Sequence, residues 1–220
     1  MGAVFQFQSS ASLKKLTGRR VYNLEDLLDT IKTCPDSSIF CHTFSAFLTM
    51  REVQVPYNTE FAIWVSRSLN EKALAEKLMA IDLSEYGTIE SLRMRLIEIF
   101  EAYREQKPDA FQRIADEPFY LYDMIRIVYP TDKFAYDLKS FRELLPTISI
   151  YSVYFHFFES RLNTHLKADD FSTWIEESLN IPDLAQMISK IDISLYTLEE
   201  LRTRIIQLID EHLEKTEQKS

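Results

Sequence analysis

The sequence predicts an all-α protein made of two homologous helical units. Apolar residues recur at helical spacing along most of the chain, and its two halves repeat one pattern of residues. Glycine and proline are scarce, at 3 and 7 of 220 residues, whereas a sheet-rich protein with many hairpins would need more of these turn residues. Hydrophobic residues form 46% of the chain, which is enough for buried cores.

The repeat relates segments of the first half of the chain to segments of the second half. The matched segments are 38–42 with 152–156, 61–64 with 171–174, 68–70 with 178–180, and 81–82 with 191–192. A repeat of this length is domain-sized. We therefore expect an internal duplication whose two copies pack on each other. The loop between His42 and Trp64 is longer than its counterpart in the second copy.

Domain boundaries follow from this repeat and from local polarity. A first helical unit is expected at residues 1–106 and a second at residues 119–215. Residues 107–118 are polar, contain Pro108 and are expected to form a linker. Residues 216–220 are expected to form a frayed tail.

The first copy opens with an apolar segment, residues 5–7, that is too short to assign. A helix is expected after it, ending near Leu16, with Gly18 in the left-handed conformation that closes helices. Asn23 is a natural N-cap for the next helix, whose apolar stripe runs to Ile31. Further helices are expected at residues 38–50, 60–69, 71–80 and 89–103.

The second copy repeats this order. Asp137 takes the place of Asn23 as an N-cap, and Thr197 with Glu200 forms a capping box before the last helix. Residues 153–158 are apolar almost all round, which is typical of a central, buried helix. The remaining helices of this copy are expected at residues 170–179, 182–190 and 198–212.

Charge and cysteine content exclude several classes of function. The net charge of −9 disfavours binding to nucleic acid backbones. Cys34 and Cys41 both lie in the first copy, so a structural disulfide is not expected. No signal peptide or membrane-spanning apolar run is seen, which fits a cytoplasmic protein without membrane contact. No spacing of His, Cys or carboxylates suits a metal ion, and no cofactor is expected.

Several short motifs of the first half share their order and spacing with a known family. They are Phe5-Gln-Phe7, Ser12-Leu13, Leu16-Thr-Gly-Arg19, Asn23-Leu24, Ser38-Ile-Phe40 with His42, Phe61-Ala-Ile-Trp64, Leu74-Ala-Glu-Lys-Leu78 and Ile81-Asp82. On these motifs the chain resembles a bacterial family known only as a domain of unknown function. The resemblance implies an all-helical fold, no known reaction, cofactor or catalytic residue, and gene neighbourhoods that contain sugar-transfer enzymes.

The chain departs from the family pattern at two places. The family has Asn-Asp directly before Phe-Ala-x-Trp, whereas this chain has Asn58-Thr59-Glu60 there. In the second copy, Thr131-Asp132-Lys133 replaces the Thr-Gly-Arg element. If that element binds a ligand, the first copy alone keeps the site.

Histidine and tryptophan are shared by the two copies. His42 and His156 lie in aromatic helices, where an imidazole beside a carboxylate can act as an acid or base near neutral pH. The alternative is a core histidine satisfied by one hydrogen bond, which is favoured because no triad spacing is present. Trp64 and Trp174 either stack on a sugar or base, or pack in the core with a bonded indole N–H. Their place on apolar stripes favours packing.

A basic patch in the first copy is the strongest candidate binding site. Several cations with hydroxyls near a glycine suit a phosphate or an acidic partner. The alternative is ordinary helix chemistry, in which cations favour the C-terminal dipole. The patch consists of Lys14, Lys15, Arg19 and Arg20, flanked by Ser9, Ser10, Ser12 and Thr17. In the second copy only Lys133 remains, at the position that matches Arg19.

The sequence thus predicts a non-catalytic interaction or regulatory module that recognises a protein partner or an anionic ligand. A link to sugar metabolism is implied by the resemblance alone. The alternative is a small-molecule binding protein or an enzyme that uses His42, which would need a pocket reaching that residue. The candidate ligand-binding residues are Lys14, Thr17, Gly18, Arg19, Arg20, His42 and Trp64.

Overall fold

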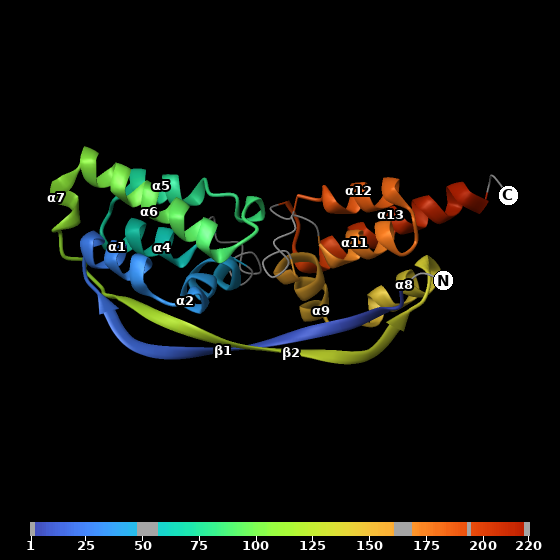
Figure 1. Cartoon of the computed structure of the whole chain (residues 1–220). Coiled ribbons are helices and arrows are strands. Elements are labelled where there is room, and N and C mark those ends of the chain that lie inside the picture. The colour runs from blue at the N-terminus through green and yellow to red at the C-terminus, as the bar shows by residue number, and fades with distance from the viewer. Residues whose placement is uncertain (1–2, 48–56, 161–168, 193–194, 218–220) are drawn as a thin grey trace. The chain divides into compact units, whose positions relative to one another are not determined.

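The computed structural model describes residues 3–47, 57–160, 169–192 and 195–217. Two long strands, β1 (Phe5–Val21) and β2 (Phe119–Ala135), pair in a two-stranded antiparallel sheet, and helices form most of the rest (Figure 1). Helices hold 62% of the described residues and strands 17%, so the fold is mixed and the predicted all-α class is wrong.

The predicted helix ending near Leu16 is wrong because this segment lies in β1. Gly18 has a φ of 81°, so it takes the left-handed conformation inside a strand and not at a helix end. The scarcity of turn residues did not exclude this sheet, since helices, and not a hairpin, connect its two strands along the chain. Residues 9–15 contain no β-branched or aromatic residue, so pairing with β2, more than local propensity, keeps them extended.

The chain forms two compact units that do not follow its linear order. Unit 1 contains Met1–Ala11 and Arg126–Ser220, and unit 2 contains Ser12–Ile125. Each strand therefore passes from one unit to the other along its length. This division differs from the expected boundaries at residues 106 and 119. The expected linker also contains a short helix, α7 (Pro108–Phe111), with buried residues at Ala110 and Phe111.

The described part of unit 2 is mainly helical apart from its parts of the two strands. Its helix α6 packs on α1, α2, α5 and α7, while α4 packs on α5 and on the turn η1 (Figure 1). Side-chain caps from Asn23, Thr59 and Thr88 begin α1, α4 and α6. The elements are α1 (Leu24–Thr33), α2 (Asp36–Phe40), η1 (Cys41–Ser45), α4 (Glu60–Ser68), α5 (Lys72–Met79), η2 (Leu83–Glu85), α6 (Ile89–Gln106) and α7.

Unit 1 has a similar succession of helices. Helix α13 packs on α8, α9 and α12, while α11 packs on α12 and on the turn η4. Its elements are α8 (Leu138–Leu144), η3 (Leu145–Thr147), α9 (Ile150–Tyr154), η4 (Phe155–Glu159), α11 (Asp170–Glu177), α12 (Pro182–Ser189) and α13 (Leu198–Glu217). Because α13 reaches Glu217, residues 216–217 of the expected tail are helical. Residues 218–220 lie outside the described part of the chain.

One helix in each unit ends at an asparagine. Asn70, after α4, and Asn180, after α11, have φ values of 53° and 57°. The amides that follow them bond back to the carbonyls of Val65 and Ile175, each at 3.2 Å. Asparagine tolerates this left-handed conformation, and the back-bonded amide closes the helix.

Each unit buries one strand and exposes the other. The inner strand is residues 119–124 in unit 2 and residues 5–10 in unit 1. The outer strand, exposed or half-buried throughout, is residues 12–20 in unit 2 and residues 126–134 in unit 1. The buried apolar side chains of the inner strands are Phe5, Phe7, Phe119, Leu121 and Met124.

Two expectations from the sequence fall partly outside the described residues. The predicted helix at 38–50 is helical up to residue 47, and its last three positions are not described. Most of the longer loop before Trp64, residues 48–56, is likewise not described.

Candidate functional site

Each shared histidine lies in a widened helical turn. His42 belongs to η1 and His156 to η4, and both turns are π-helical. Such bulges inside helices are frequent at functional positions. The exposed fraction is 0% for His42 and 3% for His156, so both imidazoles are held in the interior of their units.

In unit 2, His42 connects the inner strand to helix α4. Its Nε2 accepts the backbone N–H of Tyr122 at 2.9 Å, and its Nδ1 lies 2.5 Å from Oε2 of Glu60. Because Nε2 accepts a hydrogen bond, the ring proton is on Nδ1 and is donated to Glu60. Burial alone would raise the pKa of Glu60, but the bonds from His42 and Lys14 outweigh it and hold this pKa below its ordinary value.

In unit 1, His156 makes the same connection between the inner strand and helix α11. Its Nε2 accepts the backbone N–H of Gln8 at 2.7 Å, and its Nδ1 lies 2.7 Å from Oδ2 of Asp170. The hydroxyl of Ser152 also donates to the carbonyl of Gln8. Both backbone groups of Gln8 are thereby bonded to helix side chains. We call each histidine, its carboxylate and the bonded strand amide a strand clamp.

The two tryptophans fix the chain just before each inner strand. Nε1 of Trp64 donates to the carbonyl of Glu117 at 2.8 Å, and Nε1 of Trp174 donates to the carbonyl of Ala3 at 2.6 Å. In both units this carbonyl lies two residues before the first buried phenylalanine, and the clamped amide lies three residues after it. Each tryptophan is 6% exposed, so neither ring offers an open face to a sugar or base.

A threonine of each outer strand bonds the inner strand. Oγ1 of Thr17 donates to the carbonyl of Leu121, and Oγ1 of Thr131 donates to the carbonyl of Phe7, both at 2.6 Å. Each of these hydroxyl oxygens also accepts the amide two residues further along, at 3.1 and 3.2 Å. Thr17 and Thr131 therefore have one structural role, although a glycine follows Thr17 alone.

The structure brings Lys14 of the basic patch to the clamp of unit 2. Its Nζ lies 3.0 Å from Oε1 of Glu60, whose other oxygen bonds His42. Burial lowers the pKa of Lys14, but the hydrogen bond and charge of Glu60 outweigh it, so this pKa is raised. Lys14, Glu60 and His42 thus form one connected polar group. It reaches the surface through Lys14.

The other predicted ligand-binding residues lie along the same outer strand or in the core. Nη1 of Arg19 donates to Oγ1 of Thr33 at 3.2 Å, and the guanidinium of Arg20 lies over the ring of Tyr120 at 5.5 Å. Trp64 is separate from this strand and packs on the inner-strand residue Phe119. The predicted site residues therefore divide into the exposed basic strand and the buried residues His42 and Trp64. Lys14 is linked to His42 through Glu60.

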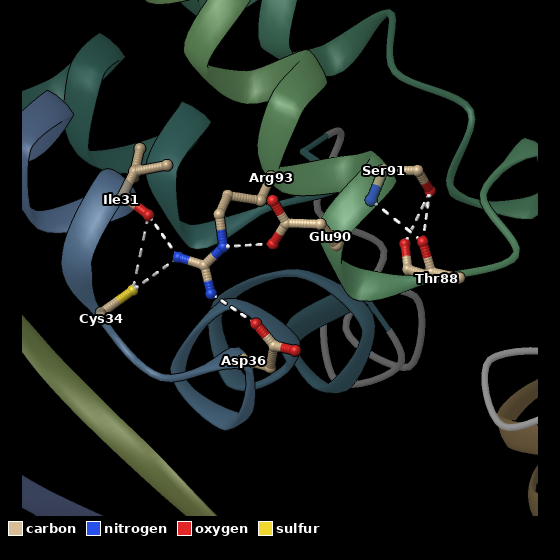
Figure 2. Close-up of polar contacts among 7 residues, drawn as sticks. All are labelled: Ile31, Cys34, Asp36, Thr88, Glu90, Ser91 and Arg93. Atoms are coloured by element: carbon tan, nitrogen blue, oxygen red, sulfur yellow. Dashed lines mark hydrogen bonds and ion pairs between the residues drawn. The ribbon is translucent and has the colours of Figure 1, made fainter.

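Arg93 forms a second polar cluster in unit 2, at the end of α1 (Figure 2). Its Nη1 donates to the carbonyl of Ile31 and lies 3.7 Å from Sγ of Cys34. Its Nη2 donates to Oδ1 of Asp36 at 2.6 Å, and its Nε lies 3.2 Å from Glu90. This guanidinium joins α1, α2 and α6. Burial raises the pKa of the Cys34 thiol, which favours its protonated form.

Unit 1 contains a buried carboxylate that the sequence analysis missed. Glu159, in η4, is 0% exposed, and Nη1 of Arg126 lies 3.4 Å from its Oε2. Burial raises the pKa of Glu159 more than Arg126 and Ser10 lower it. The available signal was an acidic residue that follows an aromatic run in the second half, at a place where the first half has Ser45.

Other kinds of site find little support in the described ranges 3–47, 57–160, 169–192 and 195–217. No group of three or more His, Cys, Asp or Glu side chains there could hold a metal ion. No helix described there is long and apolar enough to cross a membrane. An open groove of about 300 Å³ lies at α11 and α12, lined by polar residues that include Ser172, Glu176 and Asp183, and His156 is not part of its lining.

The fold and the clamps define a protein of mixed helix and sheet, in which each unit packs its helices on one strand of a two-stranded sheet. The chain belongs to a family of unknown function, DUF5752, whose model matches residues 2–210. The solved structure of OrfY from Thermoproteus tenax is similar, with 28% identity over 95% of each chain and a TM-score of 0.78. No curated protein matches the sequence.

These comparisons correct or leave open parts of the sequence-based expectations. The family match is one continuous span and gives no support to the predicted internal duplication. The likeness to OrfY also extends over 95% of this chain. The bacterial origin implied by the resemblance stays a prediction.

Proposed function

We propose that the protein is a non-catalytic protein-interaction module whose unit 2 binds an acidic, extended protein segment along its outer strand. The observation that carries this proposal is an exposed basic strand with an open edge. In the described part of the chain the sheet has two strands, so β1 has β2 on one side and no strand on the other. Such an edge can take a further strand through backbone hydrogen bonds.

The side chains of this strand define the partner. Lys14, Lys15, Arg19 and Arg20 lie on residues 12–20, which contain no acidic residue, in a chain of net charge −9. Leu13 and Leu16 are exposed to 65% and 60% and add apolar contact area. Because residues 12–20 carry positive charge, electrostatic attraction favours an acidic partner at this strand edge. Pairing with the same strand of a second copy would bring like charges together.

The enzymatic alternative requires a substrate to reach His42. That ring is fully buried, and both of its nitrogens are bonded within unit 2. A general base needs a nitrogen within hydrogen-bond reach of the proton that it removes. No observation favours this alternative, and the link to sugar metabolism stays a prediction from the resemblance.

The test is titration of the full-length protein with two fluorescent synthetic peptides, one of alternating Glu and Val and one of alternating Lys and Val. We expect the acidic peptide to bind, with an affinity that falls as salt is added. The variant Lys15→Glu/Arg20→Glu should bind it about tenfold more weakly, a loss of about 1.4 kcal/mol. Backbone amide shifts in residues 12–20 should report the added strand.

The matched control is Lys133→Glu, on the outer strand of unit 1, which should leave acidic-peptide binding unchanged. Inorganic phosphate in the same assay distinguishes a strand site from a simple anion site. Equal binding of both peptides, or displacement of the acidic peptide by phosphate at matched ionic strength, would contradict the proposal.

A further inference from the structure

We infer that unit 1 is a strand acceptor that can take residues 3–10 from a second copy of the chain, so that two copies assemble by exchanging this strand. The inference goes beyond the proposed function, because it concerns the inner strand of unit 1 and not the basic outer strand of unit 2. It rests on how the strand is held, on where it leaves the unit and on a second segment of the same kind.

The strand is held as a bound peptide would be, by its backbone and by two aromatic anchors. The carbonyl of Ala3 accepts from Trp174, the amide of Gln8 is clamped by His156, and the carbonyl of Gln8 accepts from Ser152. Helix side chains therefore replace the neighbouring strand along this edge. These bonds are made to backbone groups, so the same bonds can form with a strand from this chain or from a second copy.

The anchors are Phe5 and Phe7, which are 7% and 0% exposed. Phe5 lies 5.4 Å from the ring of Trp174 and 5.7 Å from the ring of Phe171, and Phe7 stacks on Phe141 at 5.3 Å. All three receiving rings come from residues after 126, a separate stretch of the chain. The acceptor thus consists of aromatic rings and of the buried polar groups of Trp174, His156 and Ser152, which are fixed beside them.

The segment leaves unit 1 through an exposed part of β1. Ala11 and Ser12 are both exposed, and this is where β1 passes from unit 1 to unit 2. Exchange between copies needs a connection that can change its course while the seated contacts are kept. Because the same contacts form in the exchanged and unexchanged states, assembly depends mainly on protein concentration.

A second segment of the chain shows what this kind of acceptor recognises. Residues 117–122 are held in unit 2 by Trp64 and His42, with the same spacing between tryptophan-bonded carbonyl, buried phenylalanine and clamped amide. The shared pattern is an extended segment with Phe at one position and a large apolar residue two positions later. Every copy of the chain carries this pattern, which identifies a second copy as the partner.

The test mixes two full-length variants that carry different affinity tags. Phe7→Ala weakens the donated strand and keeps the acceptor, whereas Phe171→Ala weakens the acceptor and keeps the strand. The pair Phe7→Leu and His156→Gln serves if the first pair does not fold. An exchanged heterodimer contains one intact strand in one intact acceptor, so mixing should raise the dimer fraction in sedimentation velocity at least about fivefold over either variant alone.

A labelled synthetic peptide of residues 1–11 provides the second measurement. It should bind the full-length Phe7→Ala protein and bind at least about tenfold more weakly when its own Phe5 and Phe7 are changed to Ala. Absence of a heterodimer in both variant pairs, even with peptide binding, overturns the exchange. So does equal dimer formation by two differently tagged Phe7→Ala proteins, because the contact would then lie elsewhere.

Discussion

His42 and His156 make the same pair of hydrogen bonds in surroundings of different charge. Each accepts a strand amide through Nε2 and donates to a carboxylate at the start of a helix through Nδ1. In unit 2 that carboxylate, Glu60, also pairs with Lys14. In unit 1 a further buried acid, Glu159, lies in the same π-helical turn as its histidine.

This difference separates the contacts that hold the inner strand from the charged groups that surround them. The histidine and tryptophan bonds to the backbone of the inner strand recur in both units, so they are what each helical unit needs to hold that strand. The charged groups around the clamps differ, so the fold tolerates changes there. The following predictions test this separation, from the largest expected effect to the smallest.

The largest effect is expected from truncating the second buried position of each inner strand. Phe7→Ala should destabilise unit 1 by about 4 kcal/mol and Leu121→Ala should destabilise unit 2 by about 3 kcal/mol, because each leaves a cavity in a packed core. Hydrogen exchange followed by mass spectrometry measures each unit separately. We expect the loss of protection to stay within the altered unit. Equal loss in both units from either change would show that the units unfold as one.

Removal of either clamp imidazole is expected to cost slightly less. His42→Ala and His156→Ala each leave a strand amide and a carboxylate without their partner, a loss of about 3 kcal/mol. The two indole N–H signals in NMR spectra, one from Trp64 and one from Trp174, report on unit 2 and unit 1 respectively. Each variant should shift its own unit's signal. Near-wild-type stability of both variants would contradict a clamp role.

Neutralising the two glutamates should have opposite effects on stability. The folded-state pKa of Glu60 is lowered, so its charged form stabilises unit 2 above the ordinary value of 4.5, and this stabilisation is lost as pH falls through the folded pKa. Glu60→Gln should therefore cost about 1–2 kcal/mol at pH 7 and little in acid.

The pKa of Glu159 is raised in the folded state, so its charged form is disfavoured there. Stability from this group is present below 4.5 and falls as pH rises through the folded pKa. Glu159→Gln should therefore stabilise unit 1 by about 1 kcal/mol at pH 7 and have no effect in acid. Urea denaturation of both variants at several pH values measures this contrast. The same sign for both substitutions at pH 7 would refute it.

The smallest effect is expected from the ion pair on the basic strand. Lys14→Met should destabilise unit 2 by about 0.5 kcal/mol, because the Lys14 side chain is 44% exposed and solvent screens the pair. The loss should shrink as salt is added. Lys15→Met is the control, since no ion pair of Lys15 is found within the described residues. An equal loss in both variants, or a loss unaffected by salt, would argue against the ion pair as its cause.

Much of the helical content could be predicted from the sequence. Helices expected at 60–69, 71–80 and 89–103 are present as α4, α5 and α6. Apolar periodicity and capping residues such as Asn23 and Asp137 are local signals, so a short window of sequence contains them. Residue order in the sequence also indicated that His42 and His156 occupy equivalent positions, as do Trp64 and Trp174.

The sheet and the unit boundaries could not be predicted in this way. Residues 12–20 are exposed on both faces and show no alternation of apolar and polar residues, so no local pattern marks them as a strand. Their partner lies about a hundred residues away along the chain. The buried ends of the strands do alternate, at Phe5-x-Phe7 and Phe119-x-Leu121, but each is too short to assign alone.

The sequence by itself determined most of the helices, several of their caps and the residue types available for each clamp, because these depend on neighbours within a few turns. Only the tertiary structure decided that residues 3–10 are the inner strand of unit 1 and that residues 117–124 are the inner strand of unit 2. Only the tertiary structure showed that His42 and His156 bind strand amides. Almost every residue has a backbone amide, so the sequence does not indicate which one a histidine binds. Its partner is chosen by packing between distant segments.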